Sequence, residues 1–274
     1  MSMIPVNVLA ALEEMLHNAS THLPHACLPI LLNGRTVGHL VPDFAPFVID
    51  SLQRNPIKHI TVNPRGIQLD PVAPALLSNN LRELAERMRD AGLIPAWRNE
   101  EFAYYGPDGH EYFRVERGAF RAFGIQSQAA HINGFTEKGL LWVGRRSESK
   151  QIDPGKLDNL SAGGIHADET VVACAIRELW EEAGIPTTIA QNICPAGKLL
   201  IERPHPPHGI HHENLLIFDL ELPNHVVPVN HDGEVSGFIQ MDVAEVAARI
   251  LADEFTTDAA LVTADFILRR NRSS

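Results

Sequence analysis

The chain has 274 residues and carries 23 Lys and Arg against 34 Asp and Glu, a formal net charge of −11. Hydrophobic residues make up 45% and charged residues 21%, as in ordinary folded proteins and unlike disordered ones. The acidic balance argues against a nucleic-acid-binding protein, which usually carries a basic stripe. The length favours two domains, each large enough to bury its own core.

The cysteines and the first residues indicate the cellular compartment. Cys27, Cys174 and Cys194 lie far apart, which predicts neither a disulfide framework nor a zinc site and favours a reducing environment. The start lacks a basic leader and carries Glu13 and Glu14 within an apolar pattern, so it indicates an amphipathic helix rather than a signal peptide. No apolar run approaches the ~18 residues that a membrane span needs. We therefore expect a cytoplasmic protein that does not bind membranes.

Residues 1–125 are predicted to form a smaller α+β accessory domain. Apolar periodicity predicts its helices, and Asn-Gly or Asn-Pro-Arg-Gly turns between apolar runs predict its hairpins. The predicted elements are helices over residues 3–18 and 79–91, β-hairpins over 28–41 and 57–70, and two aromatic strands on either side of residues 107–109. We interpret the aromatic residues Tyr104, Tyr105, Tyr112 and Phe113 as packing residues.

A domain boundary is predicted within GIQSQAA, residues 124–130, where small and polar residues separate two patterned stretches. We assign the second domain to residues 126–274. Its strands alternate with long helices, which predicts another α/β fold. The predicted elements are strands HINGF and LLWVGRR, a helix from about Thr170 to Ala183, strands over 215–222 and 238–241, and helices over 242–252 and 258–270.

Three glutamates share one face of the helix predicted near residues 170–183. Glu178, Glu181 and Glu182 are spaced i, i+3 and i+4 and fall within an arc of roughly 100°, on a face that we expect to be exposed. The residues that point to nearly the opposite side and can pack on a sheet are Val172, Ile176, Leu179 and Ala183. Carboxylates this close repel one another unless a cation neutralises them, and oxygen ligands suit Mg²⁺ or Mn²⁺. A solvated acidic face is the alternative interpretation.

The segment GGIHADETVVACAIRELWEEAGI, residues 163–185, resembles the Nudix box, G-x5-E-x7-R-E-U-x-E-E-x-G-U, in which U is a bulky apolar residue. The nine specified positions are filled by Gly163, Glu169, Arg177, Glu178, Leu179, Glu181, Glu182, Gly184 and Ile185. The resemblance implies an α/β/α sandwich around a mixed sheet. It also implies a hydrolase that requires a divalent metal, Mg²⁺ or Mn²⁺, and cleaves a diphosphate linked to another group.

The same resemblance implies roles for single residues. The residues matched to metal binding are Glu178, Glu181, Glu182 and Gly163, the last through a nearby backbone carbonyl. Glu169 and Arg177 match the pair that braces the loop and the helix, and Glu169 approaches a metal in some members. Glu234, in DGEV, lies where many Nudix hydrolases place a further acid that binds metal or activates water. A solvated turn acid is the alternative for Glu234.

A second resemblance concerns residues 131–165, which look like Nudix proteins associated with thiamin pyrophosphokinase. The shared patterns are R-R-S-x-x-K at residues 145–150 and P-G-x-L-D-N at residues 154–159, and softer similarity covers nearly the whole chain. It implies that the substrate is thiamin diphosphate or a damaged analogue, released as monophosphate and phosphate. One position departs from the pattern, because the subgroup has Trp before its Pro-Gly and this chain has Asp153.

Five residues outside the box are candidates for substrate binding, namely Arg145, Arg146, Lys150, Asp158 and Asn159. Arginine and lysine bind phosphate oxygens, arginine through two parallel hydrogen bonds. Alternation along the strand lets only one of the two arginines face the site, and we favour Arg146. A role in bracing a turn is the alternative for Asp158 and Asn159.

The histidine-rich stretch RPHPPHGIHHEN, residues 203–214, is predicted to be a flexible surface loop because it is rich in proline. A zinc or nickel site is the alternative, since imidazole suits those metals. Cys174, one turn before Glu178, is predicted to be a small packing residue.

These patterns together predict a two-domain enzyme whose partner is a small-molecule diphosphate, with no nucleic-acid partner. Two alternatives stay open. One is hydrolysis of a nucleoside-diphosphate-linked substrate such as ADP-ribose or a dinucleotide, and the other is a non-catalytic Nudix module that senses a ligand. The intact set of acids argues against the sensing module. The sequence does not predict the oligomeric state.

Overall fold

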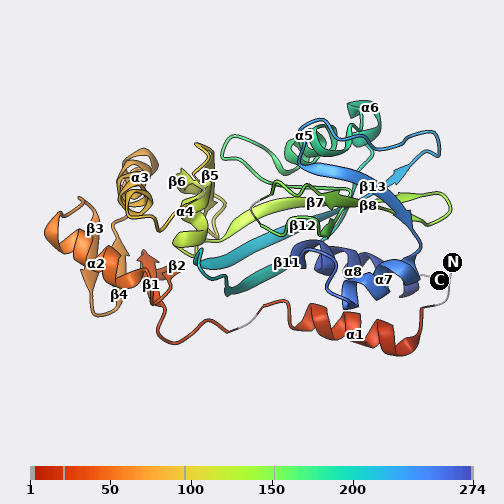
Figure 1. Ribbon diagram of the computed structural model, residues 1–274. Helices are drawn as coiled ribbons and strands as arrows, with labels where there is room; N and C mark the ends of the chain where they lie inside the picture. The colour runs from red at the N-terminus through yellow and green to blue at the C-terminus, as the bar shows by residue number, and fades with distance from the viewer. Residues whose placement is uncertain (1–3, 21, 96, 151, 273–274) are drawn as a thin grey trace.

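The computed structural model describes residues 4–20, 22–95, 97–150 and 152–272, and Figure 1 shows a smaller half and a larger half. The N-terminal elements are α1 (Val6–His17), β1 (Leu28–Leu32), β2 (Arg35–Leu40), α2 (Ala45–Arg54), β3 (Ile60–Asn63), β4 (Gly66–Leu69), α3 (Pro74–Asp90), β5 (Glu101–Tyr105), β6 (Glu111–Glu116) and α4 (Arg117–Ala122). The C-terminal elements are β7 (Ser127–Thr136), β8 (Leu141–Arg146), β9 (Leu157–Asp158), β10 (Ser161–Gly164), α5 (Val171–Ala183), α6 (Thr187–Ala190), β11 (Cys194–Pro204), β12 (Ile210–Leu222), β13 (Val235–Met241), α7 (Val243–Leu251) and α8 (Thr257–Arg272).

The smaller half contains both predicted hairpins in one sheet of order β2-β1-β4-β3, in which β1 and β4 pair in parallel. Asn33 and Gly34 join β1 to β2 with φ values of 53° and 72°, the left-handed pair that a two-residue hairpin turn requires. The aromatic strands form the separate hairpin β5-β6, where Phe113 is fully buried and Tyr104 stacks on it. Helices α2 and α4 were not predicted, because their apolar runs are too short to show helical periodicity.

The larger half is an α/β/α sandwich, as predicted. Its mixed sheet has the order β11-β12-β7-β8-β13, with β10 beside β7 and β9 beside β8, and only β12 and β7 pair in parallel within this path. Figure 1 shows α5 and α6 over one face and α7 and α8 over the other. Leu179 of α5 and Phe266 of α8 are both almost completely buried in the two cores that result.

Helix α1 precedes the smaller half in the sequence but packs in the larger one. Figure 1 shows it beneath α7 and α8, and Leu12 is fully buried in the same cluster as Val246 and Phe266. The boundary between residues 125 and 126 stays a prediction. Met3, where the predicted first helix begins, lies outside the described residues. Among the described helices, none is long and apolar enough to cross a membrane.

The prediction of a flexible loop over residues 203–214 is wrong for most of that stretch. Strand β11 continues to Pro204 and β12 begins at Ile210, so only five residues form the turn. His211 pairs with Arg203 across the hairpin and is 4% exposed. The prolines of this stretch suggested a loop. They lie at the end of β11 and in the turn, positions that proline can occupy without disrupting the pairing of the two strands.

The β5-β6 hairpin fastens the smaller half to the loop between β10 and α5. The Ala167 amide donates to the Glu101 carbonyl at 2.8 Å, and Arg114 forms an ion pair with Asp168 at 2.8 Å. A Cβ atom at Gly164 would lie 2.4 Å from the Phe102 ring, so glycine is needed for this close approach. Because this loop belongs to the Nudix-like segment, the smaller half borders the candidate site.

Candidate active site

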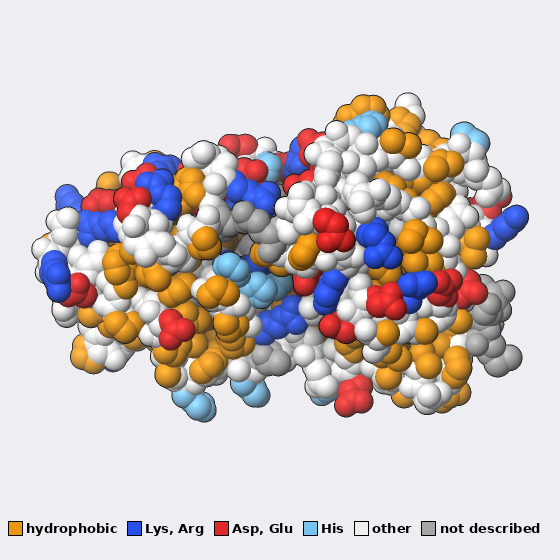
Figure 2. All heavy atoms as spheres, in the orientation of Figure 1, with side chains coloured by type: hydrophobic (Ala, Val, Ile, Leu, Met, Phe, Trp, Pro, Cys, Tyr) orange, Lys and Arg blue, Asp and Glu red, His pale blue; other side chains and the backbone are white. Residues whose placement is uncertain are grey.

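A cleft of about 330 Å³ lies between the two halves. The smaller half contributes the segment around residues 93–98 and helix α4, and the larger half contributes parts of β7, β10, β12, α5 and the 146–158 loop. Figure 2 shows histidine, lysine and arginine side chains gathered near this junction.

Helix α5 is set against β10 by local features of the sequence. The Thr170 hydroxyl accepts a hydrogen bond from the Ala173 amide at the start of the helix, and Gly184 ends it with a φ of 62°. A Cβ atom at Gly163 would lie 1.9 Å from Glu178 Oε1, so only glycine at residue 163 lets Glu178 rest on the strand. Gly163 therefore has a steric role besides the carbonyl role that the family resemblance implies.

Arg177 holds three acids in place. It forms a bidentate ion pair with Glu169, with distances of 2.8 and 2.9 Å, as expected for the pair that braces loop and helix. Its Nη1 also contacts Glu178 at 2.6 Å and Glu181 at 2.9 Å. Of the three helix acids that were predicted to bind metal, two are thus oriented by this arginine.

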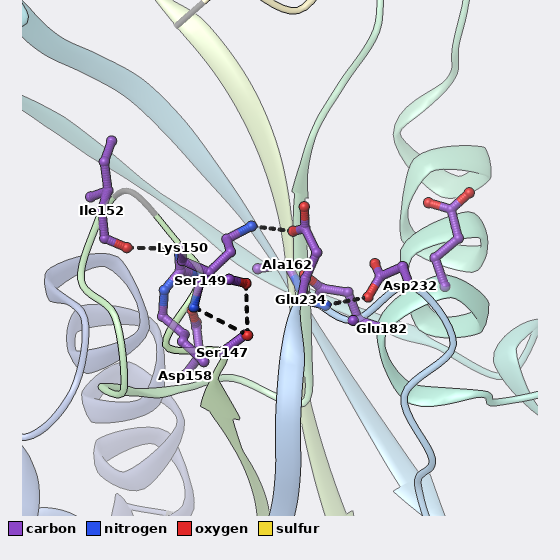
Figure 3. Close-up of polar contacts among 12 residues, drawn as sticks. Ser147, Ser149, Lys150, Ile152, Asp158, Ala162, Glu182, Asp232 and Glu234 are labelled. Carbon is purple, nitrogen blue, oxygen red and sulfur yellow. Dashed lines mark hydrogen bonds and ion pairs between the residues drawn. The ribbon is translucent and has the colours of Figure 1, made fainter.

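The third acid, Glu182, belongs to a different group. Its carboxylate lies with those of Asp232 and Glu234, with oxygens all within 4.8 Å of one another. Figure 3 shows the three side by side, with Lys150 bound to Glu234. The Ala162 amide donates to Glu182 Oε2 at 2.9 Å, which fixes this carboxylate against β10.

The acid face of α5 is not exposed, contrary to our expectation. Glu182 is 8% exposed and the Glu178 side chain 13%, whereas Glu181 keeps 43%. Two segments cover the face: β10 on one side and the stretch before β13 on the other, where the His231 amide donates to the Glu181 carbonyl. Helical periodicity shows which residues share a face but not what packs on it.

The two sides of this group differ in electrostatics. Burial, together with the negative charge of Glu178, raises the pKa of Glu182 well above its ordinary value. Burial also raises the pKa of Glu178 to about 7, although Arg177 opposes the shift. Burial alone would raise the pKa of Glu234 too, but the hydrogen bond and charge of Lys150 lower it. Among the described residues, Glu182 forms no ion pair, whereas Lys150 pairs with Glu234.

The residues present fit a hard divalent cation. Three carboxylates converge, Lys150 balances only one of them, and their oxygens are the ligand type that Mg²⁺ and Mn²⁺ prefer. Cys174 is fully buried beside the Gly163 and Gly164 carbonyls, in keeping with a packing residue. Burial raises the pKa of its thiol, so it does not compete as a thiolate ligand.

The predicted substrate-binding cations are already paired. Arg146 lines the cleft, as favoured, but donates to Asp158 at 2.9 Å and to the Ile152 carbonyl at 3.0 Å. Arg145 is not among the described residues that line the cleft, and it donates to the Gly155 carbonyl at 2.9 Å. In this structure Arg145 braces the backbone at Gly155, and its predicted role in substrate binding stays a prediction.

Asn159 also has a structural position. It is 5% exposed, and its amide donates to Asn133 and Thr263 while its oxygen lies 2.9 Å from His131 Nδ1. This network joins β9, β7 and α8 inside the larger half. These hydrogen bonds favour the bracing role for Asn159, and its contact with substrate stays a prediction. Asp158 lines the cleft but is bound to Arg146.

The other end of the cleft carries a second group of titratable residues. His211 Nε2 lies 3.2 Å from Glu213 and 3.6 Å from Asp258, and the Ser127 hydroxyl donates to Glu213 at 2.7 Å. Burial alone would raise the pKa of Glu213, but the His211 hydrogen bond and charge, with Arg121, hold it at about 2. Unlike Glu182, this buried carboxylate is matched by positive partners.

Sequence reasoning missed two sets of site residues. Asp232 stands two residues before Glu234, and the acid pair in HDGEV was a local signal for it. Arg98, Arg117 and Arg121 also line the cleft, but they come from the smaller half. No local signal points to them, since only the packing of β5-β6 on the loop before α5 brings them to the site.

Comparison with known proteins agrees with this geometry. The NUDIX domain model matches residues 126–266. The chain is 31% identical to Nudix hydrolase 24, chloroplastic, of Arabidopsis thaliana over 88% of this chain and 67% of that protein. It is 37% identical to Nudix hydrolase 20, chloroplastic, of the same plant over 66% of this chain and 49% of the relative. This chain thus spans about two thirds of the first relative and half of the second.

Among solved structures, a MutT protein from Methanosarcina mazei is similar over 54% of this chain and 94% of that one, with 19% identity and a TM-score of 0.41. The match to the domain model covers just over half of this chain and includes the whole segment from Gly163 to Ile185. It also includes Asp232 and Glu234. The chain therefore belongs to the NUDIX domain family of hydrolases.

Proposed function

We propose that this chain hydrolyses the diphosphate bond of a small organic diphosphate in a reaction that requires Mg²⁺ or Mn²⁺. The observation that carries the proposal is the group of Glu182, Asp232 and Glu234, whose carboxylates converge beside the cleft and are balanced by one paired lysine among the described residues. These residues would hold the metal together with Glu178 and the Gly163 carbonyl. A bound divalent cation supplies neutralisation of charge on the phosphoryl oxygens and the leaving group.

The remaining chemistry falls to residues of the chain. Lys150 keeps Glu234 ionised, so this carboxylate is able to accept a proton from an attacking water. Arg177 keeps Glu178 and Glu181 oriented, and Gly163 leaves space for Glu178. The intact set of helix acids argues against a non-catalytic sensing module, which need not retain all three.

Thiamin diphosphate or a damaged analogue is our candidate substrate, on the basis of the R-R-S-x-x-K and P-G-x-L-D-N patterns. The cleft supports this choice, since Asp153 lines it outside the metal group. A carboxylate there would attract a cationic ring such as thiazolium. The remaining wall is partly apolar, with Phe102, Ile125 and Ile210 available to pack on an organic group.

The test is a hydrolysis screen of the full chain with Mg²⁺ or Mn²⁺. Substrates are thiamin diphosphate and its analogues, ADP-ribose, nucleotide sugars, dinucleotides and oxidised nucleotides. Thiamin diphosphate yields thiamin monophosphate and phosphate, whereas ADP-ribose yields AMP and ribose phosphate, so the products identify the substrate class. Glu182→Gln should abolish the activity found, and Glu221→Gln, at an exposed position of β12, should not. Hydrolysis of none of these substrates with either metal would contradict the proposal.

A further inference from the structure

A diphosphate needs positive charge on the side facing the carboxylates, and the expected cations already have partners. Arg145 is bound to a backbone carbonyl, Arg146 to Asp158, and Lys150 to Glu234. Part of the hydrogen-bonding capacity of each cation is thus taken up before a phosphate oxygen arrives. Further cations at the cleft would therefore strengthen the binding of a diphosphate.

Helix α4 and the segment before β5 provide such cations. Arg98, Arg117 and Arg121 line the same cleft as Glu182 and Glu234. Among the residues that the structure describes, the guanidinium groups of Arg98 and Arg121 have no carboxylate partner. Arg117 contacts Glu100 at 3.1 Å and keeps 38% of its side chain exposed, so it has hydrogen-bond donors to spare.

Two of these arginines line the cleft together with acids of the metal group. Arg98 and Arg117 share its lining with Glu182 and Glu234. Arg98 also lines a neighbouring hollow whose lining includes Lys150, Asp232 and Glu234. Arg98 thus shares two adjoining cavities with acids of the metal group.

The backbone around Arg98 and Arg117 is held rigidly. Glu116 is 4% exposed and accepts hydrogen bonds from the amides of Arg98, at 2.9 Å, and Gly118, at 3.5 Å. The Arg117 amide donates to the Glu100 carbonyl at 2.8 Å, and its guanidinium lies 5.5 Å from the centre of the Phe102 ring. Phe102 in turn packs against Gly164 of β10. This contact fixes the position of Arg117 relative to the larger half.

We infer that Arg98 and Arg117 form a phosphate-binding site that the smaller half adds to the Nudix site, opposite Glu182 and Glu234. The inference rests on the proposed function and names its substrate class, a diphosphate held between metal-binding carboxylates and arginines. Guanidinium groups match phosphate oxygens geometrically and stay charged at every physiological pH.

Methylenediphosphonate is a diphosphate analogue in which carbon replaces the bridging oxygen, so it cannot be hydrolysed there. Its binding tests the inference without turnover. Titration calorimetry with Mn²⁺ present should show binding about ten-fold weaker in Arg98→Gln and in Arg117→Gln, since each loses a charged hydrogen bond. Arg65→Gln, an exposed arginine of the β3-β4 turn, is the matched control and should bind as the natural chain does. Mn²⁺ affinity without diphosphonate should not fall in either variant.

The outcomes separate the two proposals. Unchanged diphosphonate binding in Arg98→Gln and Arg117→Gln would overturn the phosphate site, whatever the enzyme hydrolyses. Weakened binding in a protein that hydrolyses no substrate would support the phosphate site while contradicting the proposed function. If loss of the Glu100 ion pair prevents Arg117→Gln from folding, Arg98→Gln decides alone, because its side chain has no carboxylate partner among the described residues. Arg98→Lys should bind more tightly than Arg98→Gln but less tightly than the natural chain. Lysine keeps the positive charge but lacks the planar pair of donors.

Discussion

Two buried glutamates of the same cleft, Glu182 and Glu213, have opposite electrostatic settings. Burial disfavours the charged form of both. Glu213 is matched by His211, Ser127 and the charge of Arg121, and its pKa falls to about 2. Glu182 accepts one amide hydrogen bond and otherwise faces carboxylates, and its pKa rises well above the ordinary value.

This difference in electrostatic surroundings distinguishes Glu213, a structural ion-pair residue, from Glu182, a residue of a binding site. A buried carboxylate with matched partners stabilises the fold and has nothing left to bind. A buried carboxylate among other carboxylates destabilises the fold unless a ligand neutralises it, and such sites are candidates for function. On this reasoning the end of the cleft near α5 binds metal, and the end near His211 holds β12, β7 and α8 together.

The largest effect is expected for Glu182→Gln. Activity should fall by at least ~10²-fold, because an electrostatic contribution to the transition state is lost. The metal-free protein should be as stable as the natural chain or more so, since glutamine still accepts from the Ala162 amide and carries no buried charge. Turnover and thermal unfolding with and without Mn²⁺ measure both. If Glu182→Gln lost stability but retained activity, Glu182 would be a structural residue rather than a metal-binding one.

A steric prediction follows for Gly163→Ala. The new methyl group would overlap Glu178, whose Oε1 lies 1.9 Å from the ideal Cβ position, so this acid must move. Activity should fall about ten-fold or more, since displacements on the ångström scale impair positioned catalytic groups. Gly237→Ala on β13 is the matched control, because nothing lies within 4 Å of its Cβ position. Equal activity in both variants would show that Glu178 need not lie against β10.

Glu213→Gln should give the reverse pattern from Glu182→Gln. The protein should lose about 1–3 kcal/mol of stability at neutral pH, because a charged hydrogen bond to His211 is lost. Activity should stay within a few-fold of the natural chain. Denaturant unfolding and steady-state rates measure the two effects, and a strong loss of activity at unchanged stability would place Glu213 in the functional site.

The same variant predicts a pH dependence. The Glu213 pKa is lowered from 4.5 to about 2, so its stabilising effect is fully present above about pH 4.5 and is lost as the pH falls toward 2. The stability difference between the natural chain and Glu213→Gln should therefore shrink across that range. If the stability difference between the two proteins stayed constant down to pH 2, the pKa of Glu213 would not be lowered in the folded state as described.

Local features of the fold and the site were predictable from sequence. The Asn33-Gly34 turn, the ends of α5 and the Arg177–Glu169 pair all depend on residues close in sequence or on the fixed spacing of the Nudix box. The burial of Glu182 was not predictable, because it depends on β10 and on a segment fifty residues later. Arg98 and Arg117 were missed for the same reason, since tertiary packing alone brings them to the cleft.

The smallest effect is expected at Asp153, where the thiamin-associated pattern has tryptophan. Asp153 lines the cleft and has a φ of 50°, a left-handed conformation that aspartate tolerates and tryptophan does not favour. Asp153→Trp should cost about 1–2 kcal/mol of stability through that conformation. In return, a ring stacked on the substrate contributes ~0.5–1.5 kcal/mol, enough to lower the KM for thiamin diphosphate several-fold.

The control for this last prediction is Asp153→Gly, which removes the carboxylate but accepts the left-handed conformation without strain. The ratio of kcat/KM for thiamin diphosphate to that for ADP-ribose should rise several-fold in Asp153→Trp and not in Asp153→Gly. The kcat values should stay close to that of the natural chain, because Asp153 is outside the group of Glu182, Asp232 and Glu234. An unchanged ratio in folded Asp153→Trp would mean that the 146–158 loop does not select the organic group. The thiamin proposal would then rest on the sequence patterns alone, without support from the cleft wall.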